Sequence, residues 1–215
     1  MLKALPNTLM LGALSISVAW ALGLLLGIIS ALRPNSLLDR GILLYAVGAQ
    51  SVPNFGLGII LVLIFAVRLR WLPAIDLEGP ESFVLPVATL VVMLSPMIIR
   101  NVRQSFLETM GEDSIRAARA RGLSERRVWL AHGLMVAAIP LVTLIGLQVG
   151  FVLGGSYVVE SIFNWPGIGK VTLDAIASRD FPTIQGGVLV AATVFVLVNF
   201  VVDLLYAALD PRVRS

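Results

Sequence analysis

Residues 8–32 read TLMLGALSISVAWALGLLLGIISAL and contain no Asp, Glu, Lys or Arg. As a helix rising about 1.5 Å per residue, this stretch is about 37 Å long, more than the roughly 30 Å hydrocarbon core of a bilayer. All 16 basic and 13 acidic residues of the 215-residue chain lie outside this stretch and four others like it. A charge at the bilayer centre costs about 2.5–3.5 kcal/mol, so this segregation predicts an integral membrane protein. The four other charge-free stretches are 41–67, 83–99, 133–159 and 183–202.

The composition supports the same class of protein. Hydrophobic residues make up 58% of the chain and charged residues 13%, with a mean hydropathy of +0.93; an ordinary soluble domain carries about 25% charged residues. We therefore predict an all-α fold, a polytopic membrane helix bundle that forms one transmembrane domain over residues 1–215. The expected spans are 8–32, 41–67, 83–99, 133–159 and 183–205, with a cytoplasmic loop at 100–132 and an outer loop at 160–182.

Several kinds of site are disfavoured by the residue counts. The chain has no cysteine and a single histidine, which excludes thiolate metal sites and sites built from several imidazoles. We expect no catalytic residue, no metal and no cofactor. The net charge of +3 is explained by loops that face anionic lipid, so we expect membrane lipid and not nucleic acid as a partner.

The distribution of positive charge predicts the orientation. One alternate set of loops holds eleven Lys and Arg residues and the other holds five, and the richer set is expected to be cytoplasmic. This places the C-terminus inside and the N-terminus outside. An outside N-terminus only seven residues before the first span indicates that a preceding span is absent, through truncation of the chain or of its gene.

The loop at 100–132 holds seven arginines and is the most informative segment. We expect the third span to continue as helix to Met110 and to stop at Gly111. Asp113 or Ser114 then caps a short helix that runs through Arg121, and Gly122 ends it. The result is a short helix on the inner face of the membrane.

This short helix alternates small and basic residues. Small side chains permit close approach, and arginines form forked hydrogen bonds to carboxylates, which suits docking into an acidic groove of a soluble partner. Contact with anionic lipid headgroups, worth about 1 kcal/mol per basic residue, explains the pattern equally well. The residues are Arg116, Ala117, Ala118, Arg119, Ala120 and Arg121.

Uncharged polar residues within the spans are candidates for a translocation path. Gln50, Ser51, Asn54 and Gln148 are polar side chains that are costly against lipid, yet hydrogen bonds between helices account for them as well. Pro53 is either a packing kink or a gate hinge.

Small residues four apart indicate close helix packing. Gly23 and Gly27 form one such set, and Gly146, Gly150 and Gly154 form another.

The run Arg116-Ala117-Ala118-Arg119-Ala120-Arg121-Gly122 resembles the "EAA" motif of ABC importer permeases. The similarity extends over 118–127, 159–169, 179–182 and 202–212, and is specific for the dipeptide, oligopeptide and nickel branch. Arg116 stands where the motif has glutamate, and Pro140 lies further from Gly122 than the general pattern places its proline.

The resemblance implies a type I ABC importer permease-like bundle in a bacterial or archaeal inner membrane. It implies three protein partners: ABC ATPase subunits, a second homologous permease subunit and an extracytoplasmic substrate-binding protein. ATP hydrolysis is expected on the ATPase subunits, and the substrate is a peptide or a related small solute. Family members have an additional N-terminal span. The residues implied in ATPase coupling are Arg116, Ala117, Ala118, Arg119 and Gly122.

A secondary, ion-coupled transporter or a channel subunit is the alternative. An ion-coupled carrier is expected to place ionisable residues at mid-membrane, and the five charge-free stretches contain no Asp, Glu, Lys or Arg. An intramembrane enzyme would need paired carboxylates, a Ser-His arrangement or metal ligands, and the spans show none of these patterns.

Overall fold

The computed structural model describes residues 1–73, 79–124, 128 and 134–209, and every element within them is helical. Part of the expected loop at 100–132 lies outside these residues. The helices are α1 (Leu5–Leu32), α2 (Leu37–Ser51), α3 (Asn54–Leu61) with a π-helical continuation (Val62–Arg68), a 3-10 turn (Pro80–Phe83), α4 (Val84–Met110), α5 (Asp113–Ala120), α7 (Leu134–Ile162), α8 (Ile168–Ser178) and α9 (Phe181–Leu209).

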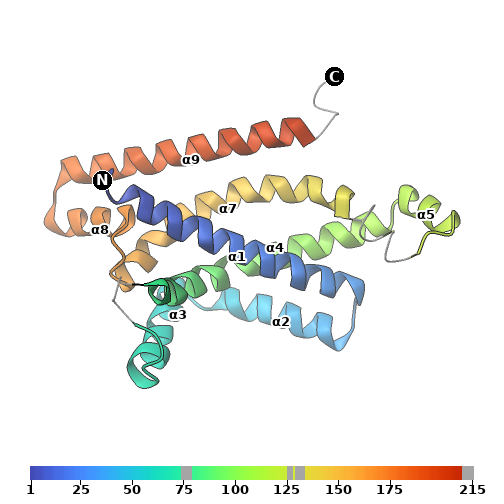
Figure 1. Ribbon diagram of the computed structural model, residues 1–215, viewed down its shortest axis with the longest axis horizontal. Helices are drawn as coiled ribbons and strands as arrows, with labels where there is room; N and C mark the ends of the chain where they lie inside the picture. Colours follow the sequence, from blue (N-terminus) through green and yellow to red (C-terminus); the bar gives the residue numbers. More distant parts are fainter. Residues whose placement is uncertain (74–78, 125–127, 129–133, 210–215) are drawn as a thin grey trace.

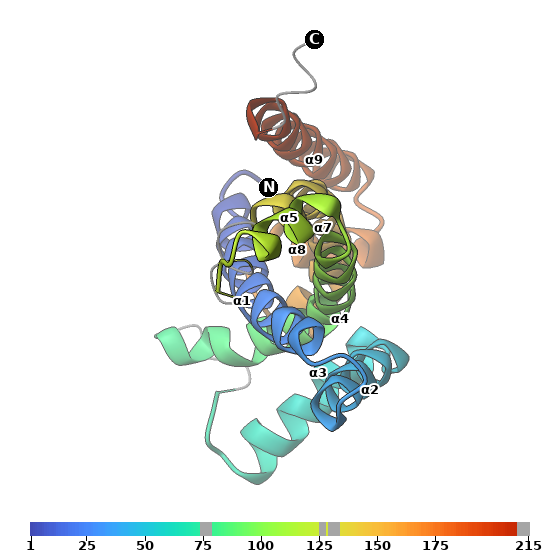
Figure 2. The ribbon, with the colours of Figure 1, turned by 90° about the vertical axis from the view of Figure 1, so that its right-hand side faces the viewer.

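The long helices lie roughly along a common axis, and the short helices α5 and α8 lie at opposite ends of the bundle (Figure 1). The end that carries α5 is called the α5 end below, and the end that carries α8 is called the α8 end. Viewed along the bundle, α9 and the α2–α3 pair flank α1, α4, α7 and α8 on opposite sides (Figure 2). The centre of the bundle is therefore α4, which packs against α1, α2, α3 and α7.

Four of the described helices are long and apolar enough to cross a membrane, and a fifth span exists if a bent pair counts as one. The bent pair consists of Leu37–Ser51 and Asn54–Arg68, which meet at an angle of 100°. Pro53 explains the break, because a proline disfavours helical geometry in the preceding residue. Val52 accordingly has extended backbone angles (φ −92°, ψ 124°). The stretch 41–67, expected as one span, is thus divided into two helices.

The glycines of α1 bring α1 and α4 into close contact. A Cβ on Gly27 would lie 2.7 Å from the Cβ of Val102 and 3.0 Å from the carbonyl oxygen of Ile99, and a Cβ on Gly23 would lie 2.7 Å from the Cβ of Ile98. The predicted close packing at these two glycines is confirmed.

In α7, Gly146 and Gly150 likewise face Asn199, Val202 and Phe195 of α9, whereas no described residue lies within 4 Å of a Cβ on Gly154. The prediction therefore holds for two of the three α7 glycines.

Replacing Gly27 with alanine is expected to lower the free energy of unfolding by about 2 kcal/mol, because the added methyl group overpacks the α1–α4 contact. Thermal unfolding of the detergent-solubilised protein measures the change. Gly48→Ala is the matched control, since none of the residues that the structure describes lies within 4 Å of a Cβ at this position and alanine is the better helix former. Equal stability of the two variants would contradict the close contact.

Candidate functional site

The short helix α5 projects beyond one end of the bundle (Figure 1). It follows α4 through a tight turn at Gly111, whose amide donates to the carbonyl of Glu108 at 3.0 Å, and the amide of Glu112 donates to the carbonyl of Thr109 at 3.1 Å. These bonds close the last turn of α4. The predicted continuation of helix to Met110 and its stop at Gly111 are confirmed.

The start of α5 differs from the expectation. The N-cap residue is Glu112, with extended angles (φ −71°, ψ 152°) and no side-chain cap bond. The first helical residue is therefore Asp113, and the prediction of Asp113 or Ser114 as the cap is wrong. The end matches: Gly122 has φ 77° and its amide donates to the carbonyl of Arg119 at 2.9 Å. A left-handed residue of this kind is a favoured helix terminator.

One face of α5 is anchored to its own chain. Ile115 and Ala118, three residues apart and hence on the same side of the helix, are fully buried together with Val128. Met110 and Leu123 pack against this cluster. Burial of these apolar groups fixes the orientation of α5 relative to the end of α4.

The opposite face of α5 is exposed and basic. Arg116 contacts Asp113 at 3.3 Å and donates to the carbonyl of Gly111 at 3.1 Å, while Nε of Arg121 donates to the carbonyl of Ala117 at 3.3 Å. Such exposed ion pairs add little stability. Of the five residues assigned to ATPase coupling, Ala118 is buried and four are exposed: Arg116, Ala117, Arg119 and Gly122.

A cavity of about 270 Å³ lies at the break between α2 and α3. Gln50, Asn54 and Gln148, which come from α2, α3 and α7, all line it. Ser51 is not among its lining residues, and its hydroxyl donates to the carbonyl of Val47 at 2.9 Å. The structure thus brings together three of the four polar residues that were predicted to line a path.

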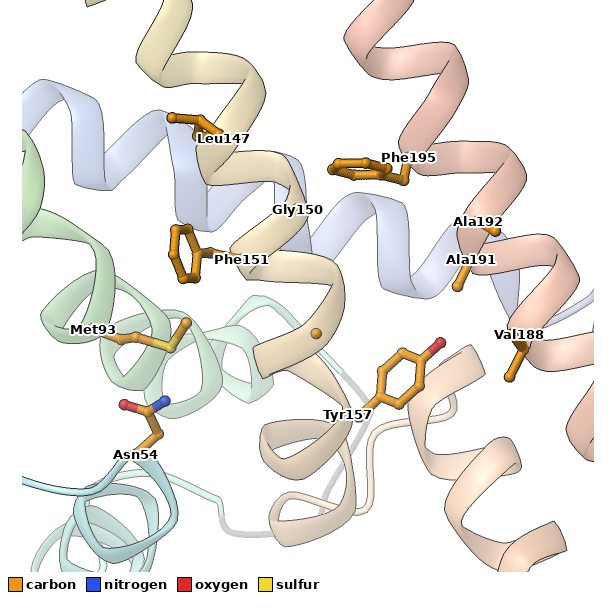
Figure 3. A pocket seen from close by; sticks show the side chains of 11 residues that line it. Asn54, Met93, Leu147, Gly150, Phe151, Tyr157, Val188, Ala191, Ala192 and Phe195 are labelled. Atoms are coloured by element: carbon orange, nitrogen blue, oxygen red, sulfur yellow. The ribbon is translucent and has the colours of Figure 1, made fainter.

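A larger and mostly apolar cavity of about 760 Å³ shares Asn54, Met93 and Phe151 with the first. In Figure 3, Asn54 and Met93 lie on one side of α7, and Val188 and Phe195 of α9 lie on the other. The two cavities therefore adjoin and follow α7 from the broken helix toward α9.

Gln50 and Gln148 differ in their hydrogen bonding. Nη2 of Arg100 donates to Oε1 of Gln50 at 2.7 Å. Gln148 is 1% exposed, and its Oε1 has no hydrogen-bond partner among the described residues. A buried amide oxygen without a partner is uncommon, since the large majority of buried polar atoms have one.

A buried carboxylate at the α8 end was not predicted from the sequence. Glu160 of α7 is fully buried; its Oε1 accepts from the hydroxyl of Thr8 at 2.7 Å, and its Oε2 accepts from the amide of Lys170 at 3.1 Å. The Thr8 hydroxyl accepts from the amide of Ile168 at 2.8 Å. Glu160 thus joins α1, α7 and the N-terminus of α8, where free amides and the helix dipole favour negative charge.

The sequence contained a signal for this junction. Gly167 and Gly169 follow Glu160 closely, and a Cβ at either position would collide with its carboxylate. Long-range contacts between residues 8 and 160 leave no pattern in a single sequence.

A second buried carboxylate lies at the α5 end. Nε and Nη2 of Arg103 donate to the two oxygens of Asp39 at 2.8 and 2.9 Å. The Ser30 hydroxyl and the Asn35 amide also donate to this carboxylate. The Asp39 carboxylate thus ties α4 to the end of α1 and the start of α2.

Replacing Arg103 with lysine is expected to lower the free energy of unfolding by about 1 kcal/mol. Lysine keeps the positive charge but cannot form the two parallel hydrogen bonds of the guanidinium group. Arg40→Lys, at an exposed position beside Asp39, is the control and should unfold at the wild-type temperature. Thermal unfolding in detergent distinguishes the two, and an Arg103→Lys variant as stable as the control would show that the bidentate geometry contributes nothing.

Comparison with solved structures confirms the predicted fold class. The chain superposes on the inward-facing MetNI methionine ABC transporter with a TM-score of 0.80 at 19% identity, covering 98% of this chain and 96% of that one. It superposes on an amino acid ABC transporter solved with histidines with a TM-score of 0.73 at 15% identity, covering 95% and 92%.

Comparison with sequences gives closer relatives. The chain is 44% identical to the glutathione transport system permease protein GsiC of Escherichia coli (strain K12), over 92% of this chain and 65% of that protein. It is 45% identical to GsiC of Pectobacterium atrosepticum, with the same coverage. The chain spans 65% of the length of these relatives. Residues 23–215 match the model of one family, and the chain therefore belongs to the binding-protein-dependent transport system inner membrane components.

Proposed function

We propose that the chain is the membrane-spanning permease subunit of an ATP-driven ABC importer. The proposal rests on the two faces of α5. Its apolar face is anchored by Ile115 and Ala118, and its outer face exposes Arg116 and Ala117 beyond the end of the bundle. ATPase subunits are the partners that would bind this face, with carboxylates opposite the arginines. The α5 end is then cytoplasmic, as is the C-terminus.

The remaining partners follow from the family. A second homologous permease subunit would complete the path, and an extracytoplasmic binding protein would deliver substrate to the α8 end. The relatives are named for glutathione transport, and we propose a peptide as the substrate class.

The contacts of α4 offer a route by which movement of α5 reaches the cavities. α4 leads into α5, and side-chain contacts join α4 to α2: Arg103 with Asp39, Ser95 with Tyr45, and Arg100 with Gln50. The broken helix that begins with α2 lines the smaller cavity. We propose that these cavities are part of the translocation path, and that tilting of α4 changes their access.

Uptake by proteoliposomes tests the proposal. The chain is reconstituted with its ATPase and permease partners, ATP is supplied at the α5 end, and loaded binding protein is supplied at the α8 end. We expect peptide accumulation that requires ATP hydrolysis. Accumulation driven by an ion gradient without ATP would support the ion-coupled alternative and overturn the proposal.

A further inference from the structure

The cavity at the α2–α3 break combines amide donors with a hydrogen-bond acceptor that has no partner in the described ranges of the chain. We propose that Gln50, Asn54 and Gln148 form a subsite that binds a peptide group of the substrate during its passage. This inference rests on the proposed function and names what the path recognises.

The acceptor is Oε1 of Gln148. Its side chain is 1% exposed, lines the cavity and has no partner for this oxygen within the described part of the chain. The side chains of Met93 and Phe151, which also line the cavity, contain no hydrogen-bond donor. An unsatisfied buried acceptor costs about 1–3 kcal/mol, and a ligand N–H that reaches this oxygen from the cavity would remove that cost.

The donors come from the broken helix. Oε1 of Gln50 already accepts from Arg100 at 2.7 Å, so the amide nitrogen of Gln50 is the group that remains to donate. Asn54 contributes a second side-chain amide at the first residue of α3. The first backbone amides of a helix also have no partner within the helix, which adds donor character on this side of the cavity.

The Gln148 acceptor and the amide donors opposite it favour one chemical class of ligand. A cation would lie near the guanidinium of Arg100, which contacts Gln50, and an anion would face the carbonyl oxygen of Gln148. A neutral group with one N–H and one C=O matches both sides, because it donates to Gln148 while it accepts from Gln50 or Asn54. A peptide group has this pair of functions.

The adjoining space fits the rest of a small peptide. The 760 Å³ cavity begins at Asn54, Met93 and Phe151 and is lined mostly by apolar residues. Its volume lies within the range of about 300–1,000 Å³ that is usual for small-molecule sites. Apolar parts of a peptide can therefore lie along α7 while one peptide group is held at the break.

Gln148→Leu tests the subsite, because leucine removes the acceptor at similar size. Proteoliposomes with the complete transporter and loaded binding protein are given glutathione or a mixture of di- and tripeptides. Loss of one hydrogen bond predicts an uptake rate about tenfold lower, with ATP hydrolysis within about twofold of wild type. Gln185→Leu, at an exposed position of α9, is the control and should transport normally.

Two outcomes overturn the subsite alone: wild-type uptake by Gln148→Leu, or an equal fall of uptake and ATP hydrolysis, which would mean a structural role. If the wild-type transporter takes up no peptide at all, the proposed function fails and the subsite fails with it.

An analogue in which one amide N–H of the substrate is replaced by an ester oxygen identifies the ligand group. The preference for amide over ester should be about tenfold larger in wild type than in Gln148→Leu. The binding protein is the same in both, so its own preference cancels. An identical preference in the two proteins would show that Gln148 does not read a peptide N–H.

Discussion

Replacing Ala117 with tryptophan is expected to reduce ATP-dependent uptake at least about tenfold while the chain still inserts and folds. Ala117 lies on the exposed face of α5, opposite the buried Ile115 and Ala118. A large side chain on this exposed face would prevent close approach of an ATPase subunit. A change of about 1.4 kcal/mol in that contact already alters affinity tenfold. Uptake and ATPase co-purification are the measurements.

Ala117→Ser is the matched control, because serine keeps the small size, and its uptake should stay within about twofold of wild type. Ala118→Trp should behave differently from Ala117→Trp. Ala118 is fully buried against Val128 and Ile115, so the bulky residue should lower the yield of folded protein. Normal uptake by Ala117→Trp would contradict the docking role of α5.

Replacing Glu160 with alanine is expected to lower the free energy of unfolding by at least about 3 kcal/mol. The carboxylate accepts from Thr8 and from the amide of Lys170, and its removal leaves buried donors without an acceptor. Hydrogen bonds to a charged group contribute about 1.5–3 kcal/mol each. Thermal unfolding in detergent measures the loss of stability. Limited proteolysis should cleave the variant near α8 earlier than it cleaves the wild type.

Asp174→Ala provides the comparison for Glu160→Ala. Asp174 forms an exposed ion pair with Lys170 at 2.6 Å on the same helix, and exposed pairs of this type contribute at most about 1 kcal/mol. If both variants unfold at the same temperature, Glu160 does not hold the junction of α1, α7 and α8.

Local features of this chain were predictable from its sequence. The absence of charge over residues 8–32 indicated α1, and a helix stop at Gly111 and a left-handed residue at Gly122 followed from known glycine preferences. Gly23 and Gly27 indicated a close contact. In each case the determining residues lie within a few positions of one another.

Features that depend on distant residues were not predictable. Pro53 indicated a bend, but only the packing of α3 against α4 and α7 sets the angle of 100°. The burial of Ala118 depends on Val128, which lies beyond the turn at Gly122. Glu160 and Asp39 were missed because their partners lie far away in the sequence or on another helix.

The residues of the candidate path were predictable only in part. Its polar residues were recognisable because polar side chains are costly against lipid. The sequence could not distinguish Ser51, which forms a hydrogen bond within its own helix, from Gln148, which lines the cavity and whose Oε1 has no partner among the residues that the structure describes. That distinction requires the relative positions of α2, α3 and α7.

Site-specific cross-linking tests whether α5 receives the ATPase subunits. The chain has no cysteine, so Ala117→Cys and Ala177→Cys each introduce a unique thiol at an exposed position, one on α5 and one on α8. In the assembled transporter, a thiol-to-amine cross-linker should join position 117 to the ATPase subunit and leave position 177 unlinked to it. A cross-link from position 177 to the ATPase, or none from position 117, would contradict the account.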